Sequence, residues 1–508
     1  MPAVTRRDFL KLASLAPAAL GASALARTSK PSMAAGAPNL IVLVFDAWSA
    51  RHMALHGYPR LTMPNVEEFA KRATIYHRHY SPGTFTGPGT ASLLTGLHPW
   101  THRALALSGE IAAGHRRDQI FKLLSDSHFT LGFSQNEFAD LLLAQAAPDL
   151  DERIPISSFS LQRNLFYSAG LFSGDALGAH NSFEYNIFQR DTGADASLFF
   201  GPLRTLADWR VARGLNQEYL MTYPHGIPAS PDLFRLEDVV DGVIGLLRGL
   251  RQPSLAYLHL YPPHGDYRPK GKFNHLFMDD LHAPEKPAHP LVRDVKSADR
   301  EESQRRRYDQ YLASWDAEVA RLLEYLKTSG LLETSYVLIT SDHGELFERG
   351  VVGHSTPLIY EPIVHVPLIV SSPRQTERID VLSTTSSLDL LPTIASLASQ
   401  DVPSWAEGRL LPGFGGMPDE DRSLYSMDAK TNSAFTKLER LSISLLKHDY
   451  RLTYYRYPDD HFEAFELYNL AEDPEEVVNI YTTQPSVATP LREELLDTIT
   501  EVNRPFAT

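Results

Sequence analysis

Polar residues suited to metal binding and acid–base chemistry follow three apolar runs of this 508-residue chain. Asp46 follows the first run, His264 comes soon after the second, and Asp342-His343 follows the third. If these runs are parallel strands of one α/β sheet, the residues converge at the carboxyl ends of the strands, where ligands bind in such sheets. Two carboxylates and an imidazole suit a divalent metal ion. Taken singly, an Asp after a strand is more often a turn or helix-cap residue, so the prediction depends on the group.

A hydroxyl nucleophile is the second candidate feature, in the segment 84–90 with the sequence Thr-Phe-Thr-Gly-Pro-Gly-Thr. Gly87 and Gly89 let the backbone approach a ligand closely, and Pro88 suits the first turn of a helix. Thr86 is therefore expected at a helix N-terminus, where free N–H groups and the helix dipole favour an anion. Local sequence alone leaves open that Thr86 is only a helix N-cap.

The composition excludes several other kinds of site. The chain has no Cys, so thiolate zinc sites, iron–sulfur clusters, thiol nucleophiles and disulfides are ruled out, and any metal must bind to oxygen and nitrogen. The 48 Lys and Arg against 62 Asp and Glu give a formal net charge of -14. Because this charge repels a phosphate backbone, we expect no nucleic-acid partner.

The first residues have the pattern of an export signal. Arg6-Arg7 is followed by Phe9-Leu10-Lys11 and by an Ala-rich apolar run that ends at Ala26. Residues 1–26 therefore resemble a twin-arginine signal peptide, which predicts use of the twin-arginine export machinery and a periplasmic or extracellular location. An uncleaved membrane anchor is the alternative, although the run is shorter than the about 20 residues needed for a span. No other stretch is long and apolar enough to cross a membrane, so we expect no stable membrane span.

Buried strands alternate with helical patterns along the rest of the chain. The clearest helix is expected over residues 305–328, with Gly330 after its end. This order predicts an α/β fold with a mostly parallel sheet sandwiched by helices. The arginines 305–307, at the start of the helix expected over 305–328, are interpreted as a solvated helix face rather than a basic patch. The strands are expected at 40–45, 129–133, 254–261, 336–340 and 366–371, where the residues are almost all apolar.

Two units are expected after the signal. Residues 37–397 carry the α/β pattern, and the loop 262–290 within them is long enough to act as a lid. Residues 398–508 are expected to form a smaller C-terminal α+β subdomain. Its elements are predicted as strands at 441–446, 451–455 and 465–468 and a closing helix at 490–502.

Several motifs together resemble the sulfatase family within the alkaline-phosphatase superfamily. Their order and spacing extend over nearly the whole chain after the signal, which implies an alkaline-phosphatase-like fold. The motifs are Pro38-Asn39-Leu40 before Asp46, His56-Gly57-Tyr58-Pro59-Arg60, Thr86-Gly-Pro-Gly-Thr-Ala-Ser-Leu-Leu-Thr-Gly, Pro263-His264, Thr340-Ser341-Asp342-His343-Gly344-Glu345, Gly353-His354, and Glu466-Leu467-Tyr468-Asn469-Leu470.

The resemblance assigns a role to each candidate residue. It implies one divalent metal ion, of Ca²⁺, Mn²⁺ or Zn²⁺ type, that lowers the pKa of the nucleophilic hydroxyl. It also implies that His264 and His354 act as catalytic and substrate-binding residues at the ester oxygens. A satisfied structural histidine is the alternative at each of these two positions. The implied metal ligands are Asp46, Thr86, Asp342 and His343, with Thr86 as the nucleophile.

Four positions depart from the family pattern. Sulfatases carry Cys or Ser where this chain has Thr86, and convert it to an aldehyde hydrate that threonine cannot form, so no formylglycine is expected. Ala47 stands where a second carboxylate is usual, and Thr90 where the signature has Arg. Gln135 and Glu137 stand where Lys and His usually hold the sulfate oxygens, so Gln135 becomes the substrate-binding candidate.

Three functions remain open. The first is a metal-dependent hydrolase or transferase of phosphate or phosphonate esters that acts through a Thr86 intermediate, because water can displace phosphothreonine in line. The second is a sulfuric-ester hydrolase that uses unmodified threonine. The third is a non-catalytic relative that binds an anion or glycan, since Ala47 and Thr90 are changes that a decaying active site would have. In the first two, the substrate is a small-molecule or glycan-linked anionic ester.

Overall fold

The computed structural model describes residues 36–161, 209–210, 212–229, 232–278, 281 and 283–506. The predicted signal peptide, residues 1–26, lies outside these ranges. Among the helices of the described ranges, none combines the length and the apolar character that a membrane crossing requires.

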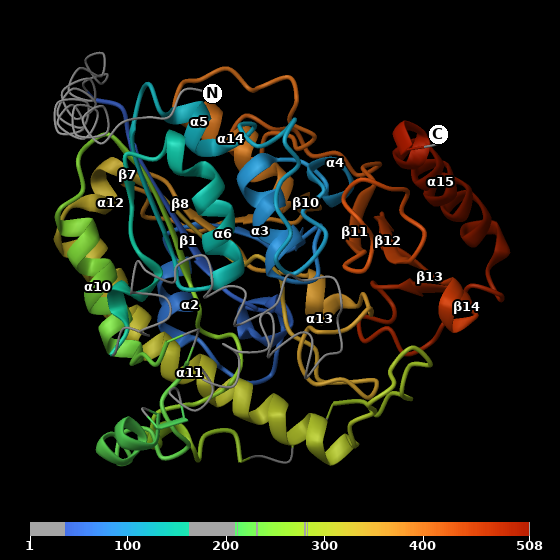
Figure 1. The fold of residues 1–508 in the computed structure, drawn as a ribbon, viewed down its shortest axis with the longest axis horizontal. Helices are drawn as coiled ribbons and strands as arrows, with labels where there is room; N and C mark the ends of the chain where they lie inside the picture. Colours follow the sequence, from blue (N-terminus) through green and yellow to red (C-terminus); the bar gives the residue numbers. More distant parts are fainter. Residues whose placement is uncertain are drawn as a thin grey trace, which may run out of the picture.

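An eight-stranded sheet forms the centre of the molecule (Figure 1). Its order is β5-β4-β6-β1-β7-β8-β2-β9, and the five strands from β5 to β7 are parallel. All residues of β1 and β6 are buried, which explains why their sequences are mostly apolar. The strands are β1 Asn39–Phe45, β2 Thr74–Tyr76, β4 Phe129–Ser134, β5 Glu152–Arg153, β6 Ser254–Leu260, β7 Ser335–Thr340, β8 Leu368–Ser371 and β9 Ile379–Val381.

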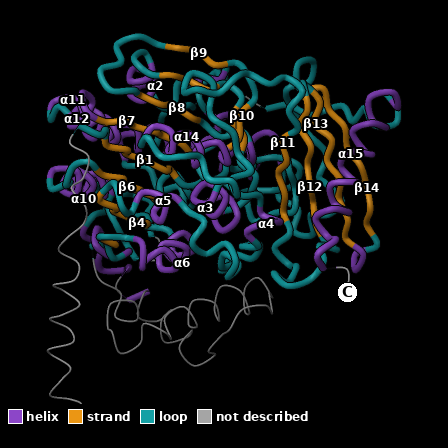
Figure 2. The backbone as a smooth tube through the Cα atoms, turned by 90° about the horizontal axis from the view of Figure 1, so that it is seen from above, coloured by secondary structure: helices purple, strands orange, loops and turns teal. Residues whose placement is uncertain are grey.

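Helices cover both faces of this sheet (Figure 2). Alternate residues of β1 point to opposite faces, so Ile41 and Leu43 pack in one core while Leu40 and Val42 pack in the other. The first core includes α2 Pro64–Ala70, α10 Leu236–Arg248, α11 Ala298–Thr328 and α12 Leu331–Thr334. The second includes α3 Thr86–Thr95, α5 Ile120–Leu124, α6 Glu137–Ala146 and α14 Leu390–Leu397. The predicted α/β sandwich is confirmed.

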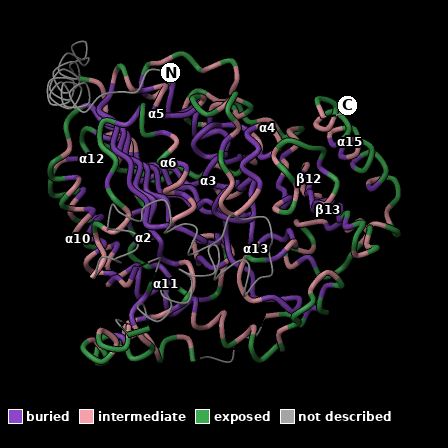
Figure 3. Tube along the Cα trace, in the orientation of Figure 1, coloured by how far each residue is buried: buried purple, intermediate pink, exposed green. Residues whose placement is uncertain are grey.

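A separate antiparallel sheet forms the C-terminal part, with α15 Pro485–Asn503 packed on it. The helix begins at Pro485, where proline is favoured as the first helical residue, and the predicted start, Pro490, lies inside the helix. The strands are β11 Leu424–Asp428, β12 Leu441–Lys447, β13 Tyr450–Tyr457 and β14 Phe462–Asn469. Buried residues gather at the centre of the molecule, in the strands of the large sheet and in helices such as α3 that pack on it (Figure 3).

The C-terminal sheet contacts the chain just before Thr86. The N–H of Met427 donates to the carbonyl of Pro82, and the hydroxyl of Ser426 donates to the carbonyl of Ser81. The remaining short elements are β3 His79–Tyr80, which pairs with β10 Thr385–Ser386, and the helices α4 Pro99–His102 and α13 Glu361–Val364.

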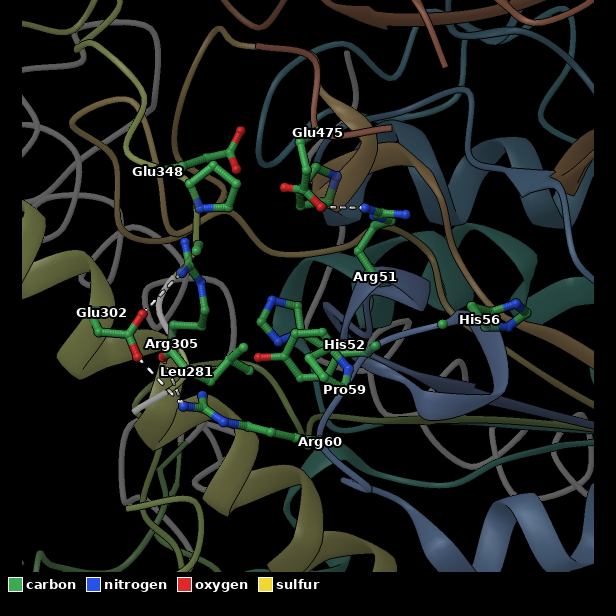
Figure 4. Close-up of a pocket in the computed structure, with 15 residues that line it drawn as sticks. Arg51, His52, His56, Pro59, Arg60, Leu281, Glu302, Arg305, Glu348 and Glu475 are labelled. Carbon is green, nitrogen blue, oxygen red and sulfur yellow. Dashed lines mark hydrogen bonds and ion pairs between the residues drawn. The ribbon is translucent and has the colours of Figure 1, made fainter. Parts of the chain in front are cut away.

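The long helix α11 differs from its prediction at one end. It begins at Ala298, capped by the Ser297 hydroxyl, and not at Arg305. The prediction of a solvated arginine face is wrong for Arg305, which is 12% exposed at its side chain and donates to Glu302 and to the carbonyl of Phe347. Figure 4 shows Arg305 beside Glu302 in a pocket wall. These contacts tie the start of α11 to the loop after β7.

The segment 262–290 contains one 3₁₀ turn, Gly271–Phe273, and no helix or strand elsewhere among its described residues. The prediction of a long loop is confirmed for those residues. Its role as a lid stays a prediction.

Candidate active site

The order of the central sheet places the candidate metal ligands together. Strand β1 lies between β6 and β7, so Asp46 after β1 is next to the residues that follow β7. The Ser341 hydroxyl lies 2.7 Å from the carbonyl oxygen of Phe45 and donates to it, which joins the two strand ends. The N–H of Asp46 donates to the carbonyl of Leu260, which joins β1 to β6. The side chains therefore start from a rigid edge.

Asp46, Asp342 and His343 form a fully buried cluster in which one ligand atom from each lies within 4.8 Å of the others. The Nε2 of His343 lies 3.4 Å from Asp46 Oδ1 and 3.7 Å from Asp342 Oδ2. Asp46 Oδ1 is buried and has no hydrogen-bond partner among the described residues. Buried polar atoms are rarely left without a partner, so an unpartnered carboxylate oxygen in an oxygen and nitrogen donor set fits a divalent cation.

Thr86 is the first residue of α3, and its hydroxyl faces this cluster. Its Oγ1 lies 3.4 Å from His343 Nε2. The N-cap of α3 is Phe85, so the alternative in which Thr86 is only a helix N-cap is wrong. A Cβ atom at Gly89 would lie 2.3 Å from the carbonyl oxygen of Asp342, which explains why glycine is needed where α3 meets the loop after β7.

Each of the two aspartates has one oxygen held by donors. Asn136 Nδ2 donates to Asp46 Oδ2 at 2.6 Å and also to Thr86 Oγ1 at 3.2 Å. Asp342 Oδ1 accepts from the backbone N–H groups of Ala47 and His343, at 3.3 and 3.0 Å. The other oxygen of each carboxylate, Asp46 Oδ1 and Asp342 Oδ2, faces His343.

The two predicted catalytic histidines also lie beside the cluster. The ring centroid of His354 is 4.3 Å from that of His343 and 4.7 Å from that of His264. His264 Nδ1 donates to the carbonyl of Gly265, which fixes its ring and leaves Nε2 free to act on a substrate. His354 Nδ1 lies 2.8 Å from Glu345 Oε1. Both rings are thus oriented by a partner on one nitrogen.

Burial and charge shift the pKa values of this group in opposite directions. Burial would raise the pKa of Asp46, but His264, His259 and His343 outweigh it and hold that pKa well below its usual value. Burial opposes charge on His343, yet Asp342 and Asp46 raise its pKa to about 9. Without a cation, the two carboxylates therefore favour a charged imidazole between them.

The pair of Glu345 and His354 is tuned by burial. Burial raises the pKa of Glu345 to about 7, although His264 and His343 lower it. Burial lowers the pKa of His354 to about 3, and the neighbouring His343 lowers it further. Below pH 7 the carboxyl group of Glu345 is protonated and donates a hydrogen bond to His354 Nδ1. The neutral His354 ring then carries its proton on Nε2, which is a donor.

Gln135 is buried after β4, and its Oε1 accepts from the backbone N–H of Tyr261 at 3.2 Å. The next residue, Asn136, is the one that reaches Asp46 and Thr86. The substrate-binding role of Gln135 stays a prediction. Sequence reasoning missed Asn136, although it is the second of two amides that follow a buried strand, at the carboxyl edge of the sheet where ligands bind.

Sequence reasoning also missed His259, the last residue but one of β6. Its Nε2 lies 3.4 Å from Asp46 Oδ2 and 3.7 Å from Asp342 Oδ2. The signal was an imidazole inside an otherwise apolar, fully buried strand.

A cavity of about 460 Å³ lies between the α/β unit and the C-terminal sheet. Ser355 and Thr356, which follow His354, line one side of it, and Lys430 lines another. Lys430 Nζ lies 3.7 Å from Asp428 Oδ2 and 5.9 Å from the ring centre of Phe85, the residue before Thr86. A cationic side chain of the C-terminal unit therefore lies close to the candidate nucleophile.

A second cavity, of about 190 Å³, is lined by Arg51, Arg60 and Arg305 together with Glu302, Glu348 and Glu475 (Figure 4). Each arginine is paired with one of the acidic residues. This balance of paired charges indicates a structural network.

Known proteins match the chain over most of its length. A sulfatase family profile matches residues 38–400, and an "N-sulphoglucosamine sulphohydrolase, C-terminal" profile matches residues 354–504. The choline-sulfatase of Rhizobium meliloti (strain 1021) is 24% identical over 474 residues, which cover 87% of this chain and 84% of the relative. The "multifunctional alkaline phosphatase superfamily protein PehA" of Trinickia caryophylli is 22% identical over 505 residues, or 87% of this chain and 91% of the relative.

The fold matches solved structures as well. The crystal structure of the phosphonate monoester hydrolase of Agrobacterium radiobacter superposes with a TM-score of 0.65 at 16% identity, covering 92% of this chain and 96% of that one. The similarity supports a mixed α/β fold with an antiparallel C-terminal subdomain and, with the family profile, an ester hydrolase. Because the sulfatase profile extends over more than half of the sequence, the chain belongs to the sulfatase family.

Proposed function

We propose that this sulfatase-family hydrolase hydrolyses or transfers phosphate or phosphonate esters and uses the unmodified hydroxyl of Thr86 as its nucleophile. The observation that carries the proposal is the position of Thr86 Oγ1, 3.4 Å from His343 Nε2 at the edge of the Asp46, Asp342 and His343 cluster. A hydroxyl at the start of a buried helix, beside two carboxylates and an imidazole, is in the right place for activation.

The residues that would hold a divalent cation are Asp46, Asp342, His343 and Thr86. When bound, the cation would lower the pKa of the Thr86 hydroxyl and polarise the ester oxygens. Oxygen and imidazole donors are compatible with Ca²⁺, Mn²⁺ or Zn²⁺.

The side chains around Thr86 have separate roles in charge stabilisation, proton transfer and substrate binding. Asn136 Nδ2 donates to Thr86 Oγ1 and stabilises the charge that develops there when the hydroxyl proton passes to the unprotonated Nε2 of His264. Thr86 Oγ attacks phosphorus, the bond from phosphorus to the leaving oxygen breaks, and that oxygen takes a proton from the Nε2–H of His354. Once protonated in this way, His264 donates a hydrogen bond from Nε2 to a non-bridging oxygen, while its Nδ1 stays on the carbonyl of Gly265. Water or an acceptor alcohol then displaces Thr86 from phosphorus in line and gives its proton to His354 Nε2, while Thr86 Oγ1 takes back its proton from His264.

The residue types favour phosphorus over sulfur. Threonine cannot form the aldehyde hydrate from which sulfatases expel sulfate, whereas phosphothreonine is open to direct displacement at phosphorus. The phosphonate monoester hydrolase neighbour and the multifunctional relative are compatible with this choice. A sulfuric-ester hydrolase with unmodified threonine is the second candidate, and the choline-sulfatase relative favours it.

The third candidate, a non-catalytic protein that binds an anion or glycan, has Ala47 and Thr90 in its favour. The cluster, the nucleophile and both catalytic histidines are nevertheless present and close together. We therefore place it last.

The substrate that fits best is a small-molecule or glycan-linked anionic ester. The cavity of about 460 Å³ next to Thr356 and Lys430 has room for a leaving group of monosaccharide size. From the sequence of residues 1–26, we propose that the protein uses the twin-arginine machinery and acts in the periplasm or outside the cell.

Turnover of four ester classes tests the proposal. Wild type and Thr86→Ala are assayed on aryl phosphate, phosphonate, phosphodiester and sulfate esters after the bound metal has been measured. We expect wild type to turn over phosphorus esters and Thr86→Ala to lose that turnover. Turnover of sulfate alone would favour the second candidate, and no turnover with no bound metal would favour the third.

A further inference from the structure

His259 lies fully buried at the end of β6 and faces both aspartates of the cluster. Its Nε2 has no hydrogen-bond partner of good geometry within the described part of the chain. The two atoms that it approaches are Asp46 Oδ2 at 3.4 Å and Asp342 Oδ2 at 3.7 Å. A proton on this ring nitrogen would point at the two carboxylates.

The other ring nitrogen of His259, Nδ1, lies beside a tyrosine hydroxyl. Nδ1 of His259 lies 3.1 Å from the hydroxyl of Tyr257, two residues earlier on the same face of β6. If Tyr257 donates to Nδ1, the proton of the neutral ring is on Nε2 and points at the carboxylates. The hydroxyl of Tyr257 also forms a hydrogen bond with the hydroxyl of Thr90. In this hydrogen bond the Tyr257 oxygen accepts, so its own O–H is left for His259 Nδ1.

Thr90 explains why such a donor is needed. At this position the family signature has an arginine, whose charge supports the nucleophile and the metal ligands. Thr90 Oγ1 instead lies 3.5 Å from Asp342 Oδ2, which is at the limit of a hydrogen bond and carries no charge. Thr90 therefore gives the two buried carboxylates no charged donor at this position. His259 reaches the same carboxylates from the neighbouring strand.

The contacts of the two Asp46 oxygens indicate that His259 positions Asp46 and does not itself bind the metal. Asn136 and His259 both approach Oδ2, so Oδ1 is left to face His343. A carboxylate held on one oxygen presents the other in a fixed direction. Outer contacts of this kind hold metal-binding side chains in place in many metal sites.

We propose that His259 is a positioning residue whose Nε2–H is directed at Asp46 and Asp342 and takes the place of the missing signature arginine. Tyr257 fixes the tautomer of His259, and Thr90 contacts the hydroxyl of Tyr257. The proposal rests on the part of the proposed function that makes Asp46 and Asp342 metal ligands. It does not depend on which ester is the substrate.

Metal binding to the full-length apoprotein, without any ester, tests this role. The dissociation constant for Mn²⁺ is measured by competition with a chelator in wild type, His259→Ala and His259→Gln. We expect His259→Ala to bind Mn²⁺ about 10- to 100-fold more weakly. His259→Gln keeps an N–H donor and should recover most of the affinity, which a purely space-filling role would not require.

Tyr257→Phe and His79→Gln complete the set. Tyr257→Phe removes only the hydroxyl that fixes the tautomer of His259, and it should weaken Mn²⁺ binding less than His259→Ala does. His79 is a buried histidine that contacts Thr385 and Ser387, away from the cluster, so His79→Gln should leave the affinity unchanged. If His259→Ala does not fold, as judged by circular dichroism, His259→Gln is compared with His259→Leu.

X-ray absorption of the Co²⁺-substituted protein separates positioning from ligation. One imidazole per cobalt is expected in both wild type and His259→Gln. Two imidazoles in wild type would make His259 a ligand and overturn the proposal, as would wild-type affinity in His259→Ala. Failure of wild type to bind any divalent metal would overturn it as well, whereas a lack of ester turnover with the expected affinities would contradict only the proposed reaction.

Discussion

Asp46 Oδ1 faces His343 Nε2 at 3.4 Å and is buried without a hydrogen-bond partner among the described residues. The two residues are far apart in the sequence and meet because β1 and β7 are neighbours in the sheet. A carboxylate oxygen and an imidazole nitrogen that meet in this way are compatible with binding of a common cation.

Asp342→Ala should abolish both metal binding and turnover, because it removes a carboxylate that faces His343. A metal that binds only the folded protein stabilises it by about 2.7 kcal/mol at 100 times its Kd. We therefore expect Mn²⁺ to raise the melting temperature of the wild-type apoprotein and to leave that of Asp342→Ala unchanged. Asp380→Ala, an exposed site paired with Arg378, is the control and should behave as wild type. Activity with metal still bound in Asp342→Ala would contradict the ligand assignment.

Asn136→Ser should lower kcat by about 10²-fold, because it removes an N–H donor to Thr86. Asn136 is also the N-cap of α6, where its Oδ1 accepts from the N–H of Phe138. Serine is an equally good N-cap, so Asn136→Ser should keep the helix cap and lose only the Nδ2 donor that Asn136 gives to Thr86 and Asp46. Asn136→Ala should lose the same activity and also about 1 kcal/mol of stability. Equal kcat in wild type and Asn136→Ser would rule out this role.

Lys430→Met should raise KM by about tenfold, or 1.4 kcal/mol, for esters with an anionic leaving group and change kcat little. The reason is that Lys430 lines the cavity beside Thr356, and Thr86 is not one of the residues that line this cavity. Lys437→Met, at an exposed lysine of the same unit, is the matched control. An unchanged KM for both anionic and neutral leaving groups would place the substrate elsewhere.

The sequence predicted the elements that hold the site better than the contacts within it. Buried strands β1, β4, β6 and β7 follow from apolar runs, because both of their faces are covered. The antiparallel direction of β8 could not be read, since a buried run looks the same in either direction. Asn136 was missed in favour of Gln135 because a shift of one residue after a strand sends the side chain to another face. Strand β11, with Asp428 at its end, was also missed.

Acid should destabilise the protein through buried histidines, and His102 offers a clear case. Burial lowers its pKa to about 3, and its Nδ1 accepts from the N–H of Ala104. The unfolded side chain has a pKa near 6.5, so below that pH the unfolded chain binds a proton that the folded chain does not. The contribution of neutral His102 is thus complete above pH 6.5 and falls by about 1.4 kcal/mol for each pH unit below it.

His102→Gln should therefore lose less stability than wild type between pH 7.5 and pH 5. Unfolding by urea at several pH values measures the difference between the two proteins, in which the other titrating groups cancel. The apoprotein is used so that metal binding does not contribute. A difference that is constant with pH would contradict the buried neutral state of His102.

Trapping of the covalent intermediate tests the central claim, that unmodified Thr86 is the nucleophile. The purified protein is mixed with an aryl phosphonate or phosphate ester, quenched in acid within the first turnovers and digested, and the peptide that contains Thr86 is analysed by mass spectrometry. We expect an unmodified threonine before mixing, a phosphoryl or phosphonyl group on Thr86 after mixing, and no such adduct in Thr86→Ala. Turnover that continues in Thr86→Ala, or an adduct on a different residue, would contradict the claim.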